Sequence, residues 1–230
     1  REKGDNKKEG ACGAYQCQAE LTAYVHTAGF VSMRKYNFYS LSLHPHSKAM
    51  LIRPPRLLKK IYPSFIWSFP KEKDGIFLTF DDGPCPQVTP WVLDELDRWG
   101  AKATFFCIGK NVELYPDLFA ETVRRGHSVG CHSYSHVPGW GMPLDDYVQD
   151  VDMAAEIIRT NLYRPPYAKI TLRQAEALSL RYNIVMWNIL SRDYNRKLGH
   201  RACARNVVPY LSPGSVIVFH DSKKASKNLW

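Results

Sequence analysis

The stretch IFLTFDDGP, residues 76–84, joins a short apolar run to a pair of aspartates and a Gly-Pro turn. The run at 76–80 is typical of a buried strand, because it is short, apolar and rich in residues that favour β structure. Asp81 and Asp82 follow it directly. Two carboxylates are therefore expected at the carboxyl end of this strand.

From this strand onward, predicted strands alternate with predicted helices. Thr89 is expected to be the N-cap of the first helix, with Gly100 just past its end. Such alternation indicates βα units and a parallel sheet, either open or closed into a barrel. The other strands are expected at 103–108, 128–131, 183–187 and 215–219, with a short extended piece at 163–164, and the helices at 89–99, 116–125, 144–160, 171–181 and about 200–208.

The chain divides into three parts by composition. Residues 1–49 are expected to be an extension of uncertain structure, residues 50–73 a basic and apolar lead-in, and residues 74–230 the folded domain. Residues 1–73 hold 13 Lys or Arg against 5 Asp or Glu, whereas residues 74–230 hold 18 against 17. Because the basic excess lies in the N-terminal third, the net charge of +9 does not indicate a nucleic-acid partner.

The lead-in contains a segment that could contact a membrane surface. Residues 57–69, LLKKIYPSFIWSF, place lysines ahead of a short apolar patch. The patch is shorter than the ~18 apolar residues of a membrane span, Pro63 interrupts it, and no small-residue cleavage site follows. Peripheral membrane association through 57–69 is one expectation, and the sequence leaves both the cell envelope and the cytoplasm open as locations.

Polar residues recur at the ends of the predicted strands. His132 follows the strand at 128–131, Arg164 closes the short extended piece, and His220 follows the strand at 215–219. Asp193 lies just past the strand at 183–187. In βα barrels this end of the strands carries the active site, because its loops converge on one mouth. The pattern predicts a site for metal-assisted acid–base chemistry.

The segment HSYSH, residues 132–136, supplies two histidines four residues apart. Gly130 before it and Pro138 after it favour a loop over a helix. Two histidines at this spacing also occur on ordinary surfaces, so the pair alone is a weak signal. A nearby carboxylate would complete a three-ligand catalytic metal site with one position open for water.

The remaining motifs each allow a plain structural interpretation. The aspartates of TFDDGP suit an ordinary turn, but the same turn could bring both to the mouth, one as metal ligand and one as base. RPPY, residues 164–167, could be a rigid connector, or could place Arg164 beside a carboxylate and leave the backbone N–H of Tyr167 free for a developing oxyanion. On its own, His220 is more often a capping or partly buried residue.

Taken together, TFDDGP, HSYSH, RPPY and IVFHD resemble, in this order and at these separations, the successive motifs of the polysaccharide deacetylase family. This family is also called the NodB-homology domain or carbohydrate esterase family four. The resemblance covers about residues 74–222. It implies a distorted, incomplete (β/α) barrel that removes acetyl groups from N-acetylated glycans such as peptidoglycan or chitin-like oligomers, releasing acetate.

The resemblance also implies a role for each motif residue. Asp82, His132 and His136 would hold a divalent metal, most often zinc. Asp81 would be the general base, oriented by Arg164, and His220 the general acid, oriented by Asp193. The backbone N–H of Tyr167 would stabilise the oxyanion.

One further motif of the family, which lies between RPPY and IVFHD, departs from the family pattern in this chain. The family has D-x-x-D-W, whereas this chain has Leu190-Ser191-Arg192-Asp193-Tyr194. Asp193 is kept, Leu190 replaces the first aspartate, and Tyr194 replaces the tryptophan but could still stack on a sugar. A closing helix after His220 is expected to be missing.

The alternative function is a catalytically impaired carbohydrate-binding module on the same fold. A third possible function, hydrolysis of a small non-sugar amide, is less consistent with the intact histidine pair.

Overall fold

The computed structural model describes residues 30–32, 52–71 and 73–229. Apart from β1 (Phe30–Ser32), the expected extension at 1–49 lies outside the described residues, so its structure stays a prediction. β1 pairs antiparallel with β2 (Gly75–Asp81), the strand predicted from IFLTF.

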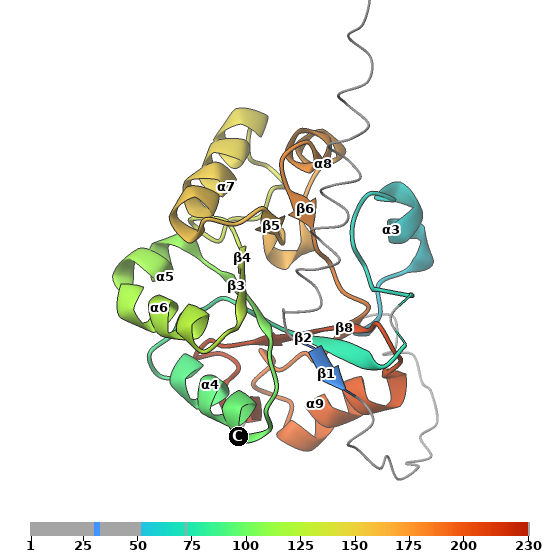
Figure 1. The fold of residues 1–230 in the computed structure, drawn as a ribbon. Coiled ribbons are helices and arrows are strands. Elements are labelled where there is room, and N and C mark those ends of the chain that lie inside the picture. The colour runs from blue at the N-terminus through green and yellow to red at the C-terminus, as the bar shows by residue number, and fades with distance from the viewer. Residues whose placement is uncertain (1–29, 33–51, 72, 230) are drawn as a thin grey trace, which may run out of the picture.

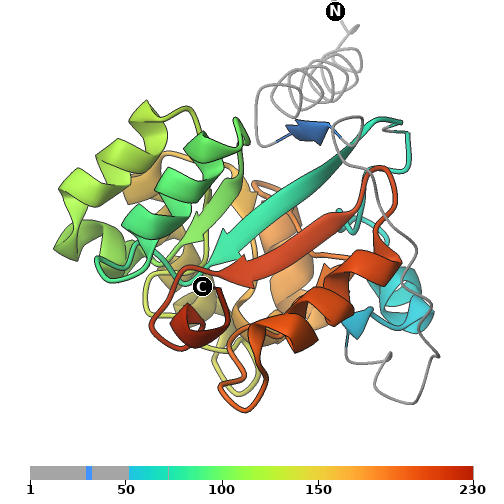
Figure 2. The same ribbon diagram turned by 90° about the horizontal axis from the view of Figure 1, so that it is seen from below.

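The sheet is built around β2, which lies between two parallel neighbours, β3 (Thr104–Cys107) and β8 (Val216–His220). Figure 2 shows β2 and β8 side by side and pointing the same way. Every pairing from one end of the sheet to the other is parallel, and the sheet curls into an incomplete barrel, as predicted (Figure 1). The order is β6 (Asn183–Ile184), β5 (Leu162–Tyr163), β4 (Ser128–Cys131), β3, β2, β8 and β7 (Ile189–Leu190).

Amphipathic helices cover the outside of the curled sheet (Figure 1). In α7 (Leu144–Ile158), Tyr147, Val151, Ala154 and Ile158 are buried, a spacing that places them on one helix face against the sheet. Burying a large apolar side chain such as Val151 or Ile158 contributes about 1.5–3 kcal/mol to the stability of the fold. The other helices are α4 (Thr89–Arg98), α5 (Gly109–Leu114), α6 (Pro116–Arg124), α8 (Leu172–Ser179), α9 (His200–Val207) and α10 (Ser226–Leu229), with short 3₁₀ turns η2 (Pro166–Ala168) and η3 (Val208–Tyr210).

The lead-in segment packs onto the domain. Phe65 and Trp67 belong to the main hydrophobic core, and Ile66 forms a parallel bridge with Val185 beyond the end of β6. The short helix α3 (Arg56–Ile61) precedes them and leaves Leu57 exposed. Within the described residues, no helix combines the length and apolar character needed to cross a bilayer. Membrane association through 57–69 stays a prediction.

One predicted strand is shorter in the structure. Residues 183–187 were expected to form one strand, but β6 ends at Ile184. The Arg164 side chain donates hydrogen bonds to the carbonyl oxygens of Val185 (3.0 Å) and Met186 (3.0 Å). Those carbonyls are therefore bound to a side chain at the point where the strand ends, and the chain rejoins the sheet only at β7.

One local prediction was wrong, and one helix was not predicted. The N-cap of α4 is Val88 rather than Thr89, and the Thr89 hydroxyl instead donates to the Asp221 carboxylate (2.6 Å) while accepting from the Cys85 N–H (2.7 Å). Tertiary partners thus replace the expected local cap. Helix α5 was also missed, because six residues beginning at a glycine carry too little periodic pattern to predict a helix.

Candidate active site

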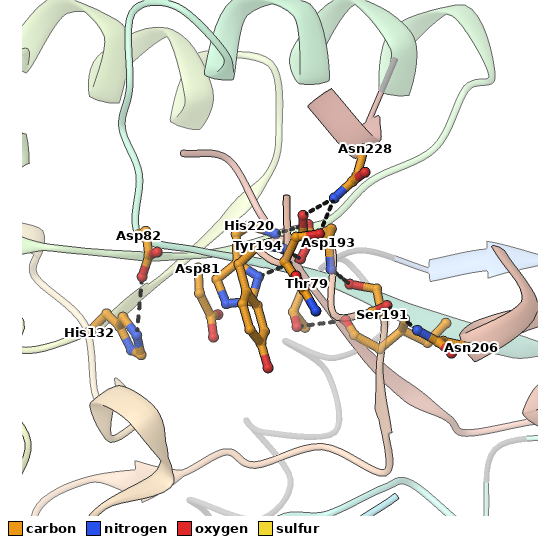
Figure 3. Close-up of polar contacts among 12 residues, drawn as sticks. Thr79, Asp81, Asp82, His132, Ser191, Asp193, Tyr194, Asn206, His220 and Asn228 are labelled. Carbon is orange, nitrogen blue, oxygen red and sulfur yellow. Dashed lines mark hydrogen bonds and ion pairs between the residues drawn. The ribbon is translucent and has the colours of Figure 1, made fainter. Parts of the chain in front are cut away.

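A cavity of about 270 Å³ opens at the carboxyl ends of the parallel strands. Seven of the nine site residues predicted from the sequence line it, while Arg164 and Asp193 are fully buried behind two of them. Figure 3 shows Asp82 facing His132 and, on the other side of Asp81, His220 held by Asp193. The lining residues are Asp81, Asp82, His132, His136, Pro165, Tyr167, Trp187, Leu190, Tyr194, Val218, His220 and Lys224.

Asp82, His132 and His136 form a metal-type ligand group. Asp82 Oδ1 lies 3.0 Å from His136 Nε2 and 3.7 Å from His132 Nε2. In a tetrahedral site with bonds of about 2.0–2.1 Å, neighbouring ligand atoms are about 3.3 Å apart. The donor atoms present therefore fit a divalent cation such as zinc. Within the described part of the chain, this is the one group of three such ligands.

The protonation states of this group also suit a metal. His132 Nδ1 lies 2.8 Å from the Arg164 carbonyl oxygen, which can only accept, so Nδ1 carries the proton and Nε2 is free to bind. Burial lowers the pKa of His132 to about 4, which keeps the ring neutral at pH 7. Burial of Asp82 favours its protonated form, but the hydrogen bond from His136 and the positive charge of His220 hold the pKa of Asp82 well below its usual value.

The two histidines lie in a loop, as predicted. Hydrogen bonds from two sides hold this loop in place. Asp150 on α7 accepts hydrogen bonds from the N–H groups of Tyr134 (3.0 Å) and Ser135 (3.2 Å). From the other side, the Gly109 N–H at the start of α5 donates to the Ser133 carbonyl (3.0 Å). Sequence patterns did not identify Asp150, because an acidic residue on an amphipathic helix is usually solvent-exposed.

Three non-glycine residues at the cavity adopt left-handed backbone conformations. The φ angles are 78° at Asp82, 55° at His136 and 58° at Tyr167. Each such residue costs about 1–3 kcal/mol and persists only where the surroundings impose it. Tyr167 lies in the first turn of η2, where backbone N–H groups have no intrahelical acceptor. The role of this N–H as a donor to an oxyanion stays a prediction.

Asp81 is held by a buried ion pair. Arg164 Nη1 lies 2.6 Å from Asp81 Oδ1, and both residues are almost inaccessible to solvent. The same guanidinium donates to Thr79 Oγ1 (2.8 Å), and its centre lies 4.0 Å from the ring centroid of Phe106. Together with the bonds to the carbonyls of Val185 and Met186, just beyond β6, these contacts fix the orientation of the Asp81 carboxylate at the wall of the cavity.

His220 at the end of β8 is paired with Asp193. His220 Nδ1 donates to Asp193 Oδ1 (2.7 Å), and the backbone N–H of His220 donates to Asp193 Oδ2 (2.7 Å). Burial of His220 lowers its pKa, but the charge and hydrogen bond of Asp193 outweigh this effect and raise the pKa to about 9. His220 is therefore an imidazolium at neutral pH.

The segment after His220 closes onto the loop that contains Asp193. Asn228 in α10 donates to the Asp193 carbonyl (2.6 Å) and the Asn195 carbonyl (3.0 Å). From the sequence, no closing helix is expected after His220, whereas the structure forms the short helix α10 there. The Tyr194 ring stands edge-on to the His220 ring, with centroids 5.1 Å apart, and is partly exposed at the mouth.

Four lining residues were missed by sequence analysis: Pro165, Trp187, Val218 and Lys224. Trp187 could have been found, since a large aromatic residue just before the altered motif at 190–194 is a plausible sugar-stacking wall. Lys224 carried no signal, because a lysine in a polar segment is ordinarily solvent-exposed.

Comparisons with known proteins show the family of this chain. The polysaccharide deacetylase family model matches residues 69–185. A peptidoglycan-N-acetylglucosamine deacetylase of Bacillus cereus is 32% identical over 166 residues, which cover 69% of this chain and 60% of that protein. The peptidoglycan-N-acetylmuramic acid deacetylase PdaC of Bacillus subtilis is 30% identical over 171 residues, covering 69% and 36%.

Solved structures share the fold of this chain. A crystal structure of a peptidoglycan N-acetylglucosamine deacetylase superposes with a TM-score of 0.68 at 31% identity, covering 73% of this chain and 81% of that chain. A pseudoenzyme of carbohydrate esterase family four from Bacillus anthracis, 20% identical with a TM-score of 0.64, shares the fold. The chain spans between about a third and three fifths of the length of the first curated relatives. On the family match and the shared fold, the chain belongs to the polysaccharide deacetylase family.

Proposed function

We propose that residues 74–230 form a hydrolase domain that cleaves the N-acetyl amide of amino sugars in a glycan and releases acetate. One observation carries the proposal: a buried Arg164–Asp81 pair and a part-buried Asp193–His220 pair converge on the cavity that also holds the three metal-type ligands. The relatives named as peptidoglycan deacetylases support peptidoglycan as the substrate class.

In this proposal, Asp82, His132 and His136 hold one divalent ion, and the resemblance to the family favours zinc. When bound, zinc would supply a Lewis acid and lower the pKa of a coordinated water toward about 7. The lone pair of His132 Nε2 is kept free by the hydrogen bond from Nδ1 to the Arg164 carbonyl. The chain therefore orients its own ligands before the ion arrives.

The two ion pairs divide the proton transfers. Asp81 accepts a proton from the attacking water, and Arg164 keeps its carboxylate in place for this step. His220 donates a proton to the departing amine nitrogen, and Asp193 keeps its imidazole charged. The backbone N–H of Tyr167 donates to the carbonyl oxygen as negative charge develops on it. Tyr194 offers an aromatic face to the sugar.

Acetate release decides between this function and its alternative. The protein would be assayed on chito-oligosaccharides and on peptidoglycan glycan strands, with and without added zinc. Zinc-dependent acetate release supports the proposal. The alternative is a catalytically impaired glycan-binding domain, which is favoured by the presence of Leu190 in the cavity in place of the family's aspartate. Glycan binding without acetate release under all conditions would favour that alternative.

His132→Ala is expected to reduce the metal content of the purified protein to a small fraction of the wild-type value. The substitution removes one of three ligands and the buried imidazole between Arg164 and Asp82. Elemental analysis measures the content directly. As a second readout, added zinc should raise the melting temperature of the wild type, since a ligand that binds only the native state stabilises it.

His200→Ala is the matched control, because His200 is exposed at the start of α9 and outside the cavity. It should keep the wild-type metal content and the stabilisation by zinc. Unchanged metal content in His132→Ala would contradict the ligand assignment.

Asp193→Asn is expected to move the alkaline limb of the rate–pH profile to lower pH by about 1–3 units. His220 must be protonated to act as an acid, so the rate falls as the pH rises through its pKa, which is raised to about 9. Removing the carboxylate leaves burial as the main influence on His220, and burial lowers its pKa. The limb is measured from rates between about pH 5 and pH 10.

The metal content of Asp193→Asn should stay at the wild-type value, because Asp193 contacts none of the three ligands in the described hydrogen bonds and ion pairs. An alkaline limb that does not move would show that Asp193 leaves the acidity of His220 unchanged.

A further inference from the structure

Charge is distributed unevenly within the domain. Residues 74–190 hold ten Lys or Arg against fifteen Asp or Glu, whereas residues 191–230 hold eight against two. The two acidic residues of the second segment, Asp193 and Asp221, are 0% and 1% exposed. Every side-chain charge that reaches solvent in residues 191–230 is therefore positive. We call this segment the basic flank.

The basic flank forms one side of the mouth of the cavity. Tyr194 in the loop after β7, His220 at the end of β8 and Lys224 in the loop after β8 contribute to the lining. The loops are tied together, since Asn228 donates to the carbonyls of Asp193 and Asn195. Figure 2 shows α10 beside the end of β8.

Lys224 is the residue of the basic flank that reaches the cavity with an uncommitted charge. Its ammonium group makes no hydrogen bond or ion pair with a described residue, whereas the neighbouring Lys227 donates to the Arg196 carbonyl (3.2 Å). Its backbone is held in place, because the next residue, Ala225, is completely buried and donates its N–H to the Ser222 carbonyl (2.9 Å). The charge is thus presented at a defined point of the mouth.

We propose that Lys224 is a specificity-determining residue that binds a carboxylate of the glycan, so that the site favours N-acetylated glycans bearing carboxylates over neutral ones. This inference rests on the proposed function. A lysine suits a carboxylate on a flexible substituent, because its ammonium is a point charge that needs no bidentate geometry. The rest of the basic flank raises the local concentration of an anionic chain. The carboxylate could belong to an acidic amino sugar or to a peptide attached to it.

Equilibrium binding tests the proposal without requiring turnover. Dissociation constants would be measured by calorimetry for three probes: a neutral N-acetylglucosamine oligomer, a peptide-free glycan containing N-acetylmuramic acid, and the same glycan with its peptide. Lys224→Gln is expected to weaken binding of the carboxylate-bearing probes about fivefold, a typical upper value for a partly exposed ion pair. Binding of the neutral oligomer should stay the same, and Lys224→Arg should restore most of the loss.

Lys223→Gln is the matched control, since Lys223 is an exposed lysine next in sequence that does not line the cavity. It should leave all three dissociation constants unchanged. The wild-type preference for carboxylate-bearing probes should also shrink as salt rises from about 0.01 M to about 1 M, because the screening length falls from about 30 Å to about 3 Å. A loss in Lys224→Gln that appears only with the peptide-bearing probe would assign the carboxylate to the peptide.

Equal weakening of all probes by Lys224→Gln, or no change in the preference, would overturn the proposal. Acetate release, measured separately, distinguishes failure of the proposal for Lys224 from failure of the proposed function. A wild type that prefers carboxylate-bearing glycans but releases no acetate would refute the hydrolase and leave the role of Lys224 supported.

Discussion

Asp81→Asn is expected to lower the rate of acetate release about 10²- to 10⁴-fold while the protein keeps its metal. General base catalysis contributes a factor of this size, and an amide of the same shape cannot accept the proton. Asp81 belongs to the ion pair with Arg164 and not to the group of metal-type ligands. Rates on a chito-oligosaccharide and elemental analysis of the same preparation measure the two effects.

Asp82→Asn is the companion variant, and it should lose both metal and activity because Asp82 Oδ1 is the oxygen that faces both histidines. The two substitutions are chemically identical and one residue apart, so their contrast depends only on position. Loss of metal in Asp81→Asn with retention in Asp82→Asn would mean that the two roles are reversed.

Arg164→Met is expected to lower the free energy of unfolding by about 3–5 kcal/mol. Arg164 is completely buried, and removing it leaves the Asp81 carboxylate, 3% exposed, without its partner. The substitution also leaves the carbonyls of Val185 and Met186 without the donors that now bind them. Urea denaturation followed by circular dichroism measures the change.

Arg181→Met is the matched control, since Arg181 pairs with Asp152 at the surface with a side chain that is 48% exposed. Its cost should stay below about 1 kcal/mol. The double variant Asp81→Asn with Arg164→Met should lose less than the sum of the two single changes, because it leaves no unpaired buried charge. A cost for Arg164→Met as small as that of the control would contradict this account of the ion pair.

Much of the fold could be predicted from local patterns. The strand at 128–131 agrees with β4 to the residue, and the strand at 215–219 and the helix at 144–160 agree with β8 and α7 within two residues at each end. The strands are short runs rich in apolar residues and the helix has amphipathic spacing, and both patterns depend on neighbours in sequence. The prediction at 183–187 was too long because its outcome depended on Arg164, about twenty residues earlier.

The chemical identities of the site were also present in the sequence. The four motifs and the stretch at 190–194 supplied the nine predicted site residues, and seven of the nine line one cavity. Their arrangement was not available locally. Adjacent residues of an ideal strand point to opposite faces, yet Asp81 and Asp82 both line the cavity, because the chain leaves the strand at Asp82 with φ at 78°.

By itself, the sequence determined the class of fold, the strand ends that carry polar residues, and the residue types available for chemistry. Tertiary structure alone decided that Asp150 holds the histidine loop and that Lys224 reaches the mouth of the cavity. The physical reason is the separation along the sequence of the residues that interact. Strand and helix patterns arise from residues a few positions apart, whereas a hydrogen bond such as that from Asn228 to Asp193 joins residues that meet only after the sheet has assembled.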